Sequence, residues 1–236
     1  MSEEQKLSPV EVIKRESQFL RGPIPEELTD GTDHFGKESI QLLKHHGTYQ
    51  QDDRDLRGGK TESGKSARRY IFMVRTKIPA GILTSDQLLT ELDLADEIGN
   101  STLRITSRQG LQLHGVLKNN LKDTIRRIND AELSTLGACG DVERNVMCCP
   151  APLRQNGVRA QMQQLAADLA AHLAPRSPAY RECWLLDPES GEKELVATGK
   201  PEEVEPIYGD VYLPRKFKTA IALPEDNCVD IYTHDL

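Results

Sequence analysis

The chain has 236 residues, of which 37% are hydrophobic and 28% are charged, and its formal net charge is −7 at pH 7. This length suffices for one large or two modest domains, and no apolar run approaches the roughly 20 residues of a membrane span. The net negative charge disfavours non-specific binding to nucleic acid, although an acidic protein can still contain a local basic site. The first residues carry neither a secretory nor an organellar signal, so we expect a cytoplasmic protein.

The N-terminal region, residues 1–62, predicts a helical and extended arm. Ser8 and Pro9 are typical of a helix start, and apolar residues at near-helical spacing continue that helix to about residue 21. A second helical pattern covers residues 37–47. Residues 49–69 are polar, contain glycine and lack periodicity, which indicates a loop or an extended arm.

Residues 63–132 predict a compact unit of mixed α+β class. We expect a strand at 70–78, a helix at 85–99 with Ser85 as its cap and Gly99 as its stop, strands at 101–106 and 111–117, and a helix at 121–130. This β-α-β-β-α order is most of a ferredoxin-like split βαβ unit without its last strand.

Residues 103–116, LRITSRQGLQLHGV, alternate apolar and polar side chains. Period-2 alternation predicts one face for the core and one polar face. Two guanidiniums, a hydroxyl, an amide and an imidazole on one face indicate a surface for an anion. The expected core side is Leu103, Ile105, Leu111, Leu113 and Val116, and the polar side is Arg104, Thr106, Arg108, Gln112 and His114.

Residues 133–236 form a third region. It contains a loop rich in glycine and cysteine (GACGDVERNVMCCPAP), a helix at 158–175, and strand-like runs at 180–187 and 207–223. The expected buried stripe of the helix is Met162, Leu165, Leu169 and Leu173.

The chain has five cysteines, an odd number, and none of them forms a C-x-x-C pair. This argues against a disulfide framework and against a tetrahedral zinc site. We expect reduced thiols and no metal ligand among them, with the first three as small buried residues. The cysteines are Cys139, Cys148, Cys149, Cys183 and Cys228.

Several cations lie in or beside the predicted strands and the third region. A single arginine on a strand is most often solvated or salt-bridged, but a set of them in an acidic chain favours a specific anion site. The set is Arg75, Arg104, Arg108, Arg144, Arg215, Lys216 and Lys218.

Five separated segments resemble, in order, the signatures of the sirohaem-dependent nitrite and sulfite reductases. They are ESQFLRGPIPEELTDG, LLKHHGTYQQDDRD, LRITSRQGLQLHGV, ACGDVERNVMCCPAP and YLPRKFKTAI. The first two are more similar to the assimilatory sulfite-reducing members than to the nitrite-reducing ones. The resemblance runs from about residue 8 to the last residue and falls on the N-terminal half of these enzymes. It implies that residues 63–132 are the ferredoxin-like half-domain and that residues 133–236 begin the sirohaem and 4Fe-4S domain.

The resemblance also implies roles for the polar residues. Sirohaem carries carboxylates, which charge-assisted hydrogen bonds hold strongly. The cofactor-binding set implied by the family is Arg104, Thr106, Arg108, Gln112, His114, Arg215 and Asn145, the last being an orienting or a turn residue. The set implied for binding sulfite and supplying protons is Arg75, Arg144, Lys216 and Lys218.

The implied reaction is the six-electron reduction of sulfite to sulfide at a sirohaem iron coupled to a 4Fe-4S cluster. The cluster's C-x5-C and C-x3-C pattern is absent here, so we expect its cysteines in a C-terminal half of the same enzyme. We therefore expect this chain alone to be inactive, with apolar faces exposed around Ile105, Leu111 and Leu113.

Other functions remain open at this point. A nitrite reductase and a non-catalytic tetrapyrrole or anion-binding fragment are the alternatives, and the electron donor is an NADPH-dependent flavoprotein subunit or a ferredoxin. An RNA-binding module is disfavoured, because residues 103–116 contain no aromatic residue on which a base would stack. His114 is a better candidate for a hydrogen-bond partner of a carboxylate than for an iron ligand.

Overall fold

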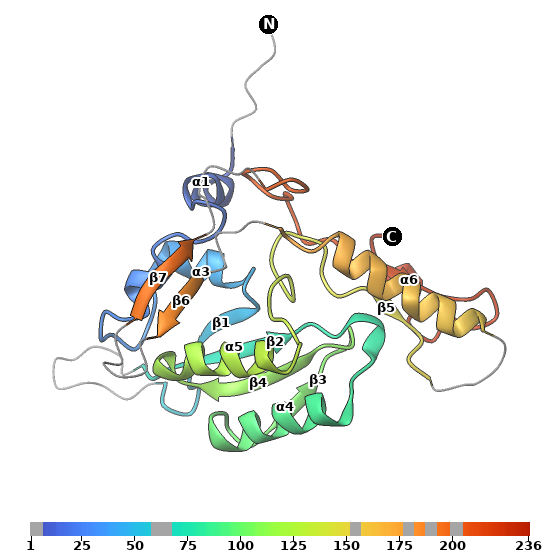
Figure 1. The fold of residues 1–236 in the computed structure, drawn as a ribbon, viewed down its shortest axis with the longest axis horizontal. Helices are drawn as coiled ribbons and strands as arrows, with labels where there is room; N and C mark the ends of the chain where they lie inside the picture. Colours follow the sequence, from blue (N-terminus) through green and yellow to red (C-terminus); the bar gives the residue numbers. More distant parts are fainter. Residues whose placement is uncertain (1–6, 58–67, 152–156, 177–181, 187–192, 199–204) are drawn as a thin grey trace, which may run out of the picture.

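The computed structural model describes residues 7–57, 68–151, 157–176, 182–186, 193–198 and 205–236 (Figure 1). Its helices are α1 (Pro9–Glu16), α2 (Ile24–Glu27), α3 (Lys37–Leu43), α4 (Ser85–Glu97), α5 (Leu121–Asp130) and α6 (Val158–His172). Its strands are β1 (Thr48–Asp52), β2 (Tyr70–Thr76), β3 (Leu103–Ile105), β4 (Leu111–Val116), β5 (Met147–Cys148), β6 (Glu182–Leu186), β7 (Lys193–Thr198) and β8 (Ala220–Ile221). Short 3-10 helices are η1 (Pro79–Gly81), η2 (Lys118–Asn120) and η4 (Ile231–Thr233).

A four-stranded antiparallel sheet with the strand order β1-β2-β4-β3 lies below the N-terminal helices in Figure 1. Helices α4 and α5 lie against one of its faces. The core between them contains the fully buried side chains of Phe72, Val74, Leu94, Leu113 and Ile128. The α+β class and the β-α-β-β-α order predicted for residues 70–130 are confirmed.

Residues 49–69, predicted as a loop or an extended arm, begin in strand β1 of the sheet. This strand pairs antiparallel with β2, from Thr48 opposite Val74 to Asp52 opposite Tyr70. Its sequence, TYQQD, has no apolar alternation, because β1 is an edge strand in which only Thr48 is buried. The outer edge of β2 is thus filled from the N-terminal region rather than by a strand that follows α5. Residues 58–67 of the predicted loop lie outside the described residues.

Side-chain caps set the starts of two predicted helices. At α1, Ser8 Oγ accepts from the Glu11 amide at 3.3 Å and the Ser8 amide donates to Glu11 Oε2 at 2.7 Å, which completes a capping box. At α4 the cap is Thr84 and not the predicted Ser85. The Thr84 hydroxyl accepts from the Gln87 amide at 3.2 Å, and the Thr84 amide donates to the Gln87 side chain at 3.0 Å.

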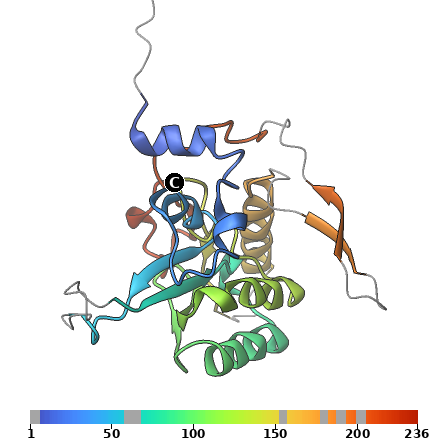
Figure 2. The same cartoon turned by 90° about the vertical axis from the view of Figure 1, so that its left-hand side faces the viewer.

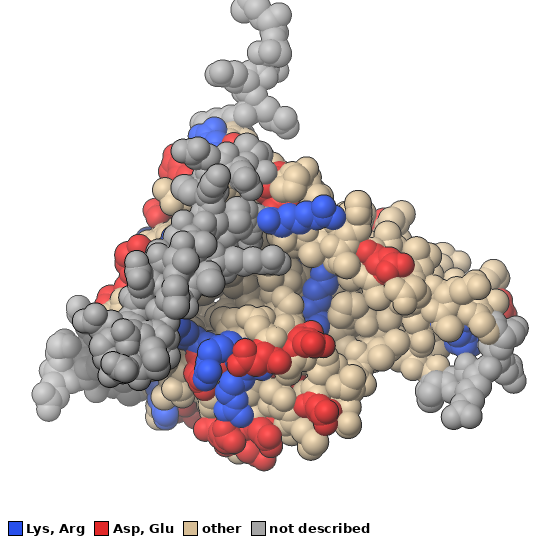
Figure 3. Space-filling model, viewed as in Figure 1, with Lys and Arg blue, Asp and Glu red and all other residues tan. Residues whose placement is uncertain are grey.

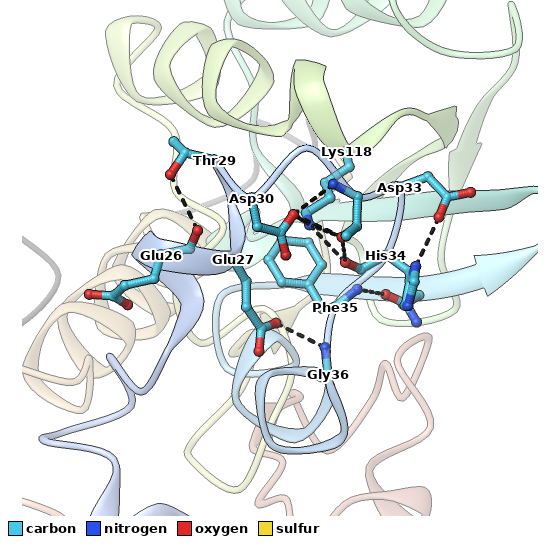
Figure 4. Close-up of polar contacts among 11 residues, drawn as sticks. Glu26, Glu27, Thr29, Asp30, Asp33, His34, Phe35, Gly36 and Lys118 are labelled. Atoms are coloured by element: carbon cyan, nitrogen blue, oxygen red, sulfur yellow. Dashed lines mark hydrogen bonds and ion pairs between the residues drawn. The ribbon is translucent and has the colours of Figure 1, made fainter.

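A buried ammonium connects the N-terminal region to the sheet unit (Figure 4). Lys118 Nζ donates to Asp30 Oδ1 at 2.9 Å, to Thr32 Oγ1 at 2.9 Å and to the His34 carbonyl at 2.7 Å. It also lies 4.6 Å from the centroid of the Phe35 ring. All three ammonium protons therefore have an acceptor, and the hydrogen bond from Lys118 is the main cause that lowers the pKa of Asp30 to about 2.

The third region has a small core of its own, in which β5 and β8 pair in parallel and α6 packs beside them. The buried side chains of α6 are Met162, Ala166 and Ala170. The predicted stripe is wrong at Leu165, which is 49% exposed. The two small alanines form the buried face instead, a choice that a leucine-based pattern does not reveal.

The strands predicted at 207–223 are mostly turns, and only Ala220–Ile221 form a strand, β8. The strand predicted at 180–187 is observed as β6, which pairs antiparallel with the unpredicted β7 in a separate hairpin (Figure 2). The side chains of this hairpin, including Cys183, lie outside the described residues. Within the described ranges, no helix has the length and apolar character needed to cross a bilayer.

Candidate functional site

The sheet face opposite α4 and α5 carries a row of aligned polar side chains. Arg75 on β2 lies opposite Gln112 on β4, which in turn lies opposite Arg104 on β3. Residues opposite each other on adjacent strands share a face, whereas Leu111 and Leu113 point to the buried side. The alternation predicted for β4 is therefore observed, and its polar face is the one that the two helices leave free.

The prediction is wrong for Ile105, which is 81% exposed although it lies opposite the buried Leu111. Ile105 is the last residue of the edge strand β3, so packing is incomplete around it. The expectation that this chain alone exposes apolar faces is correct at Ile105 and wrong at Leu111 and Leu113, which are buried as the alternation of β4 predicts. Further exposed apolar side chains on the neighbouring α4 are Leu88, Leu89 and Leu92.

Gln112 connects Arg75 to His114. In the amide orientation that satisfies both of its ends, the Gln112 oxygen accepts from Arg75 Nη2 at 2.6 Å and Nε at 3.0 Å, and its nitrogen donates to His114 Nε2 at 3.2 Å. Arg75 also lies 5.6 Å from the centroid of the Tyr49 ring. Burial, followed by the charges of Arg104 and Arg75, lowers the pKa of His114, so this imidazole is neutral at pH 7.

Asn145 joins the loop of the third region to the sheet unit. Its Nδ2 donates to the Ile78 carbonyl at 2.7 Å and to the Arg108 carbonyl at 2.9 Å, and Arg108 Nη2 donates back to the Asn145 carbonyl. Among the described residues, neither Arg108 Nη1 nor Asn145 Oδ1, both buried, has a hydrogen-bond partner. A buried guanidinium N–H without an acceptor is available to donate to an anionic oxygen.

A cavity of about 280 Å³ lies between the hydrogen-bonded Asn145 and Arg108 and the polar face of the sheet. Four cationic side chains line it, although the whole chain is acidic. On the face shown in Figure 3, by contrast, acidic and basic side chains are interspersed. The predicted residues that line the cavity are Arg75, Thr106, Arg108, Gln112, Arg144 and Asn145. The fourth cation, Lys77, was not predicted from the sequence.

The loop that carries Arg144 is held from two sides. The Arg144 amide donates to the Phe217 carbonyl at 3.1 Å, and its Nε donates to the Gly140 carbonyl at 3.3 Å. Gly140 has φ +92°, and a Cβ there would lie 2.5 Å from His45 Cδ2. Burial lowers the pKa of His45 to about 3, so its neutral Nε2 accepts from the Asp141 amide at 3.0 Å.

Lys77 and Glu143 are a buried ionisable pair beside the cavity, with exposed fractions of 7% and 2%. Burial lowers the pKa of Lys77 to about 8 and raises the pKa of Glu143 to about 7. Glu143 Oε1 accepts from the Thr219 amide at 3.2 Å, while its buried Oε2 has no partner among the described residues. Both groups therefore change protonation close to neutral pH. Their only signal in the sequence is proximity to Arg75 and Arg144, which does not predict burial.

A second cavity of about 770 Å³ adjoins the first, since Ser107 and Arg108 line both. Lys218, one of the predicted active-site cations, lines this second cavity. Its Nζ donates to the Thr233 carbonyl at 3.0 Å and lies 3.5 Å from a carboxylate oxygen of Asp235. The structure thus brings Lys218 to the same region as Arg144 but not into the same cavity.

The segment of Lys216 and Lys218 runs beside the Arg144 loop, because the Phe217 amide donates to the Val142 carbonyl at 3.1 Å. Lys216 itself is half-buried and Arg215 is exposed. Four of the predicted residues line neither cavity: Arg104, His114, Arg215 and Lys216.

The described cysteines are free thiols, and Cys139, Cys148 and Cys149 are buried, as expected for the first three. The Cys139 thiol contacts the hydroxyl of Tyr49. Burial, followed by Cys139, raises the pKa of Tyr49 to about 12, so the phenol is protonated at neutral pH.

Two family profiles match the chain one after the other. Residues 65–131 match the nitrite/sulfite reductase ferredoxin-like half domain, and residues 139–236 match the nitrite and sulphite reductase 4Fe-4S domain. The sulfite reductase [NADPH] hemoprotein beta-component of a Paenibacillus species is 49% identical over 230 residues, and that of Staphylococcus saprophyticus is 45% identical over 232 residues. The chain belongs to the nitrite and sulfite reductase family. The resemblance drawn from its five segments is confirmed.

This family member spans 39% of the length of those two relatives, which match 97% and 98% of it. The sulfite reductase [NADPH] subunit beta of Schizosaccharomyces pombe is 45% identical, and the match covers 96% of this chain and 15% of that protein. The NirA protein of Mycobacterium tuberculosis has the same fold, with a TM-score of 0.61 at 23% identity over 92% of this chain and 35% of that one.

The two cofactors of the family fit the described residues unequally. The unpartnered Arg108 Nη1 and the other cations around the first cavity fit the carboxylates of a sirohaem. A 4Fe-4S cluster requires four thiolates. In the described part of the chain, Cys149 and Cys228 approach each other with only Asp226 beside them, so these residues do not fit the cluster.

Proposed function

We propose that this chain is the N-terminal part of a sulfite reductase haemoprotein and that its two adjoining cavities receive the sirohaem carboxylates and the anionic substrate. The observation that carries the proposal is the convergence of Arg75, Lys77, Arg108 and Arg144 on one cavity in a chain of net charge −7. The names of the relatives support sulfite as the substrate, because they are called sulfite reductases. Nitrite is the competing substrate.

The reduction of hydrogensulfite to hydrosulfide consumes six electrons and six protons and releases three water molecules. The sirohaem iron, when bound, supplies the redox chemistry. Arg75 and Arg144 would bind the substrate oxygens, since guanidinium groups hold oxyanions bidentately and keep their charge. Lys77, with a pKa of about 8, and Glu143, with a pKa of about 7, would exchange protons at neutral pH. Lys218 would add a third donor from the second cavity.

Arg108 would bind a cofactor carboxylate through its unpartnered Nη1, supported by Thr106 and Gln112 on the same cavity wall. Asn145 would act by holding Arg108 in position. The remaining residues implied by the resemblance would reach the cofactor or substrate only in the complete reductase. They are Arg104, His114, Arg215 and Lys216.

The partners of the chain follow from the same proposal. The cluster cysteines and a second ferredoxin-like half would come from the C-terminal half of the reductase, and the exposed Ile105 and Leu89 offer it apolar surface. The electron donor would be a flavoprotein subunit that uses NADPH, since the relatives are named NADPH-dependent beta-components. The free thiols of the described cysteines are consistent with a cytoplasmic location.

The test uses the complete reductase with Arg144→Met, Arg108→Ala and, as a control on the exposed side of α5, Arg126→Met. Arg144→Met should lower sulfite turnover driven by reduced methyl viologen by about a hundredfold or more and leave the sirohaem absorbance in place. Arg108→Ala should lower the sirohaem content, and Arg126→Met should change neither. Full turnover in an Arg75→Met/Arg144→Met enzyme would contradict the proposal. A higher kcat/KM for nitrite than for sulfite would assign the chain to the nitrite-reducing branch.

A further inference from the structure

Three metal-ligating side chains to which the proposed function gives no role meet at the end of β5. The thiols of Cys149 and Cys228 and a carboxylate oxygen of Asp226 all lie within 4.8 Å of one another. Cys149 is buried, Asp226 is half-buried and Cys228 is exposed, so the cluster opens to solvent on one side. The parallel pairing of β5 with β8 brings these distant parts of the sequence together.

The carboxylate of this cluster is fixed by its neighbours. Arg159 Nη2 on α6 donates to Asp226 Oδ2 at 2.7 Å, and the Cys228 amide donates to Asp226 Oδ1 at 3.2 Å. Hydrogen bonds of this kind orient the ligands of metal sites from outside and leave a lone pair of the carboxylate free.

We propose that Cys149, Cys228 and Asp226 form a binding site for one thiophilic divalent cation of the Zn²⁺ class. Two sulfurs bound to zinc at about 2.3 Å lie about 3.8 Å apart in a tetrahedron, so ligation requires only a small closure of the observed cluster. The ion replaces the two thiol protons, which pass to solvent, and no electron is transferred. A water molecule takes the fourth position on the open side.

The charges of the cluster favour this occupant. Two thiolates and one carboxylate carry three negative charges, the guanidinium of Arg159 offsets one of them, and a divalent cation offsets the other two. Harder cations such as Mg²⁺ and Ca²⁺ prefer all-oxygen ligands, so the two sulfurs select a softer ion. A disulfide between Cys149 and Cys228 would not use the carboxylate of Asp226, which Arg159 and the Cys228 amide hold in place, whereas a metal ion would.

The ion would link two segments that are otherwise joined by the short β5–β8 pair. Cys149 directly follows β5, and Cys228 lies in the segment that lines the second cavity together with Lys218. Binding should therefore stabilise the wall of that cavity. None of the three ligands lines the first cavity, and Cys228 alone lines the second, so metal binding is tested separately from sulfite turnover and sirohaem content.

The experiment titrates the reduced, metal-free 236-residue chain with Co²⁺, whose bonds to thiolates give a charge-transfer band in the near ultraviolet. We expect one Co²⁺ per chain, displacement by Zn²⁺, and a rise in Tm with Zn²⁺. Cys228→Ser, at an exposed position, should halve the band and weaken binding by at least about tenfold, and Asp226→Asn should weaken binding by a similar factor. The matched controls are Cys148→Ala, a buried neighbour of Cys149, and Asp230→Asn, an exposed carboxylate on the same segment.

Retention of the band and of tight binding in both controls, with a halved band and weaker binding in Cys228→Ser, would support the site. Absence of the band in the wild-type chain would overturn it, as would a band of unchanged intensity in Cys228→Ser. A Cys149–Cys228 disulfide found by mass spectrometry, together with no cobalt binding after its reduction, would identify a redox pair instead and would also overturn the proposal.

Discussion

Replacing Glu143 with glutamine should stabilise the folded chain at pH 8 and leave its stability nearly unchanged at pH 4. Glu143 is 2% exposed, and burial raises the pKa of its carboxyl from 4.5 to about 7. The hydrogen bonds from Thr219 and the charges of Lys77 and Arg108 act in the opposite direction but do not outweigh burial. The folded state therefore favours the protonated acid, and glutamine is its neutral analogue.

The magnitude follows from the two pKa values. Below pH 4.5 the carboxyl is protonated in both the folded and the unfolded chain, so it adds no pH dependence. Between pH 4.5 and 7 the unfolded chain releases the proton while the folded chain keeps it, and the free energy of unfolding falls by about 1.4 kcal/mol per pH unit. Above pH 7 the accumulated loss is about 3 kcal/mol, and Glu143→Gln should recover most of it.

The assay is urea unfolding followed by circular dichroism at pH 4, 6 and 8, with the exposed Glu225→Gln as the matched control. The Glu143→Gln chain should gain stability relative to the wild type as the pH rises, and the Glu225→Gln chain should follow the wild type. An equal effect of Glu143→Gln at all three pH values would refute this prediction, because it would show that the pKa of the Glu143 carboxyl is the same in the folded and the unfolded chain.

Two further predictions concern the buried Lys118 and the isolated chain. Lys118→Met should lower the free energy of unfolding by roughly 2–3 kcal/mol, because it removes three hydrogen bonds that a buried ammonium donates. The exposed Lys122→Met on α5 should change it by less than about 0.5 kcal/mol, and equal losses in urea unfolding would contradict the stabilising role of Lys118. The sirohaem-loaded 236-residue chain should release no more sulfide than free sirohaem in a methyl viologen assay, because its described cysteines do not supply the four thiolates of a cluster. Release above that level would contradict this prediction, because it would show that the chain relays electrons to the iron without the cluster.

The sheet unit was predictable from sequence because its strands alternate and its helices carry clear boundaries. Leu111, Leu113 and Val116 form the buried face of β4 as the period of two predicts. Strand β1 was not predictable, since TYQQD pairs through its backbone at a sheet edge and leaves no apolar signature. Alternation also says nothing about where a sheet ends, which is why Ile105 was wrongly placed in the core.

The site was predictable in part. Arg75, Arg108 and Arg144 were identified because cations stand out in strands and in a glycine-rich loop, and all three line the first cavity. Lys77 and Glu143 were missed, since only the fold reveals that both are buried beside that cavity. The cluster of Cys149 and Cys228 was missed for a related reason, because spacing rules detect ligands that are close in sequence and not those joined by a parallel strand pair.

Anion binding in the first cavity should draw protons into the protein. A bound oxyanion disfavours the charged form of Glu143 and favours the charged form of Lys77, so it raises both pKa values, which are about 7 and about 8 in the free chain. Calorimetric titration with sulfate, which keeps its charge in this pH range, should therefore show proton uptake near pH 7–8, measured as a dependence of the binding enthalpy on the ionisation enthalpy of the buffer. In Glu143→Gln only the contribution of Lys77 should remain, and the uptake should shift toward pH 8. Binding without any buffer dependence would mean that the anion lies elsewhere than beside this pair, and the proton-supply role of Lys77 and Glu143 would then be lost with it.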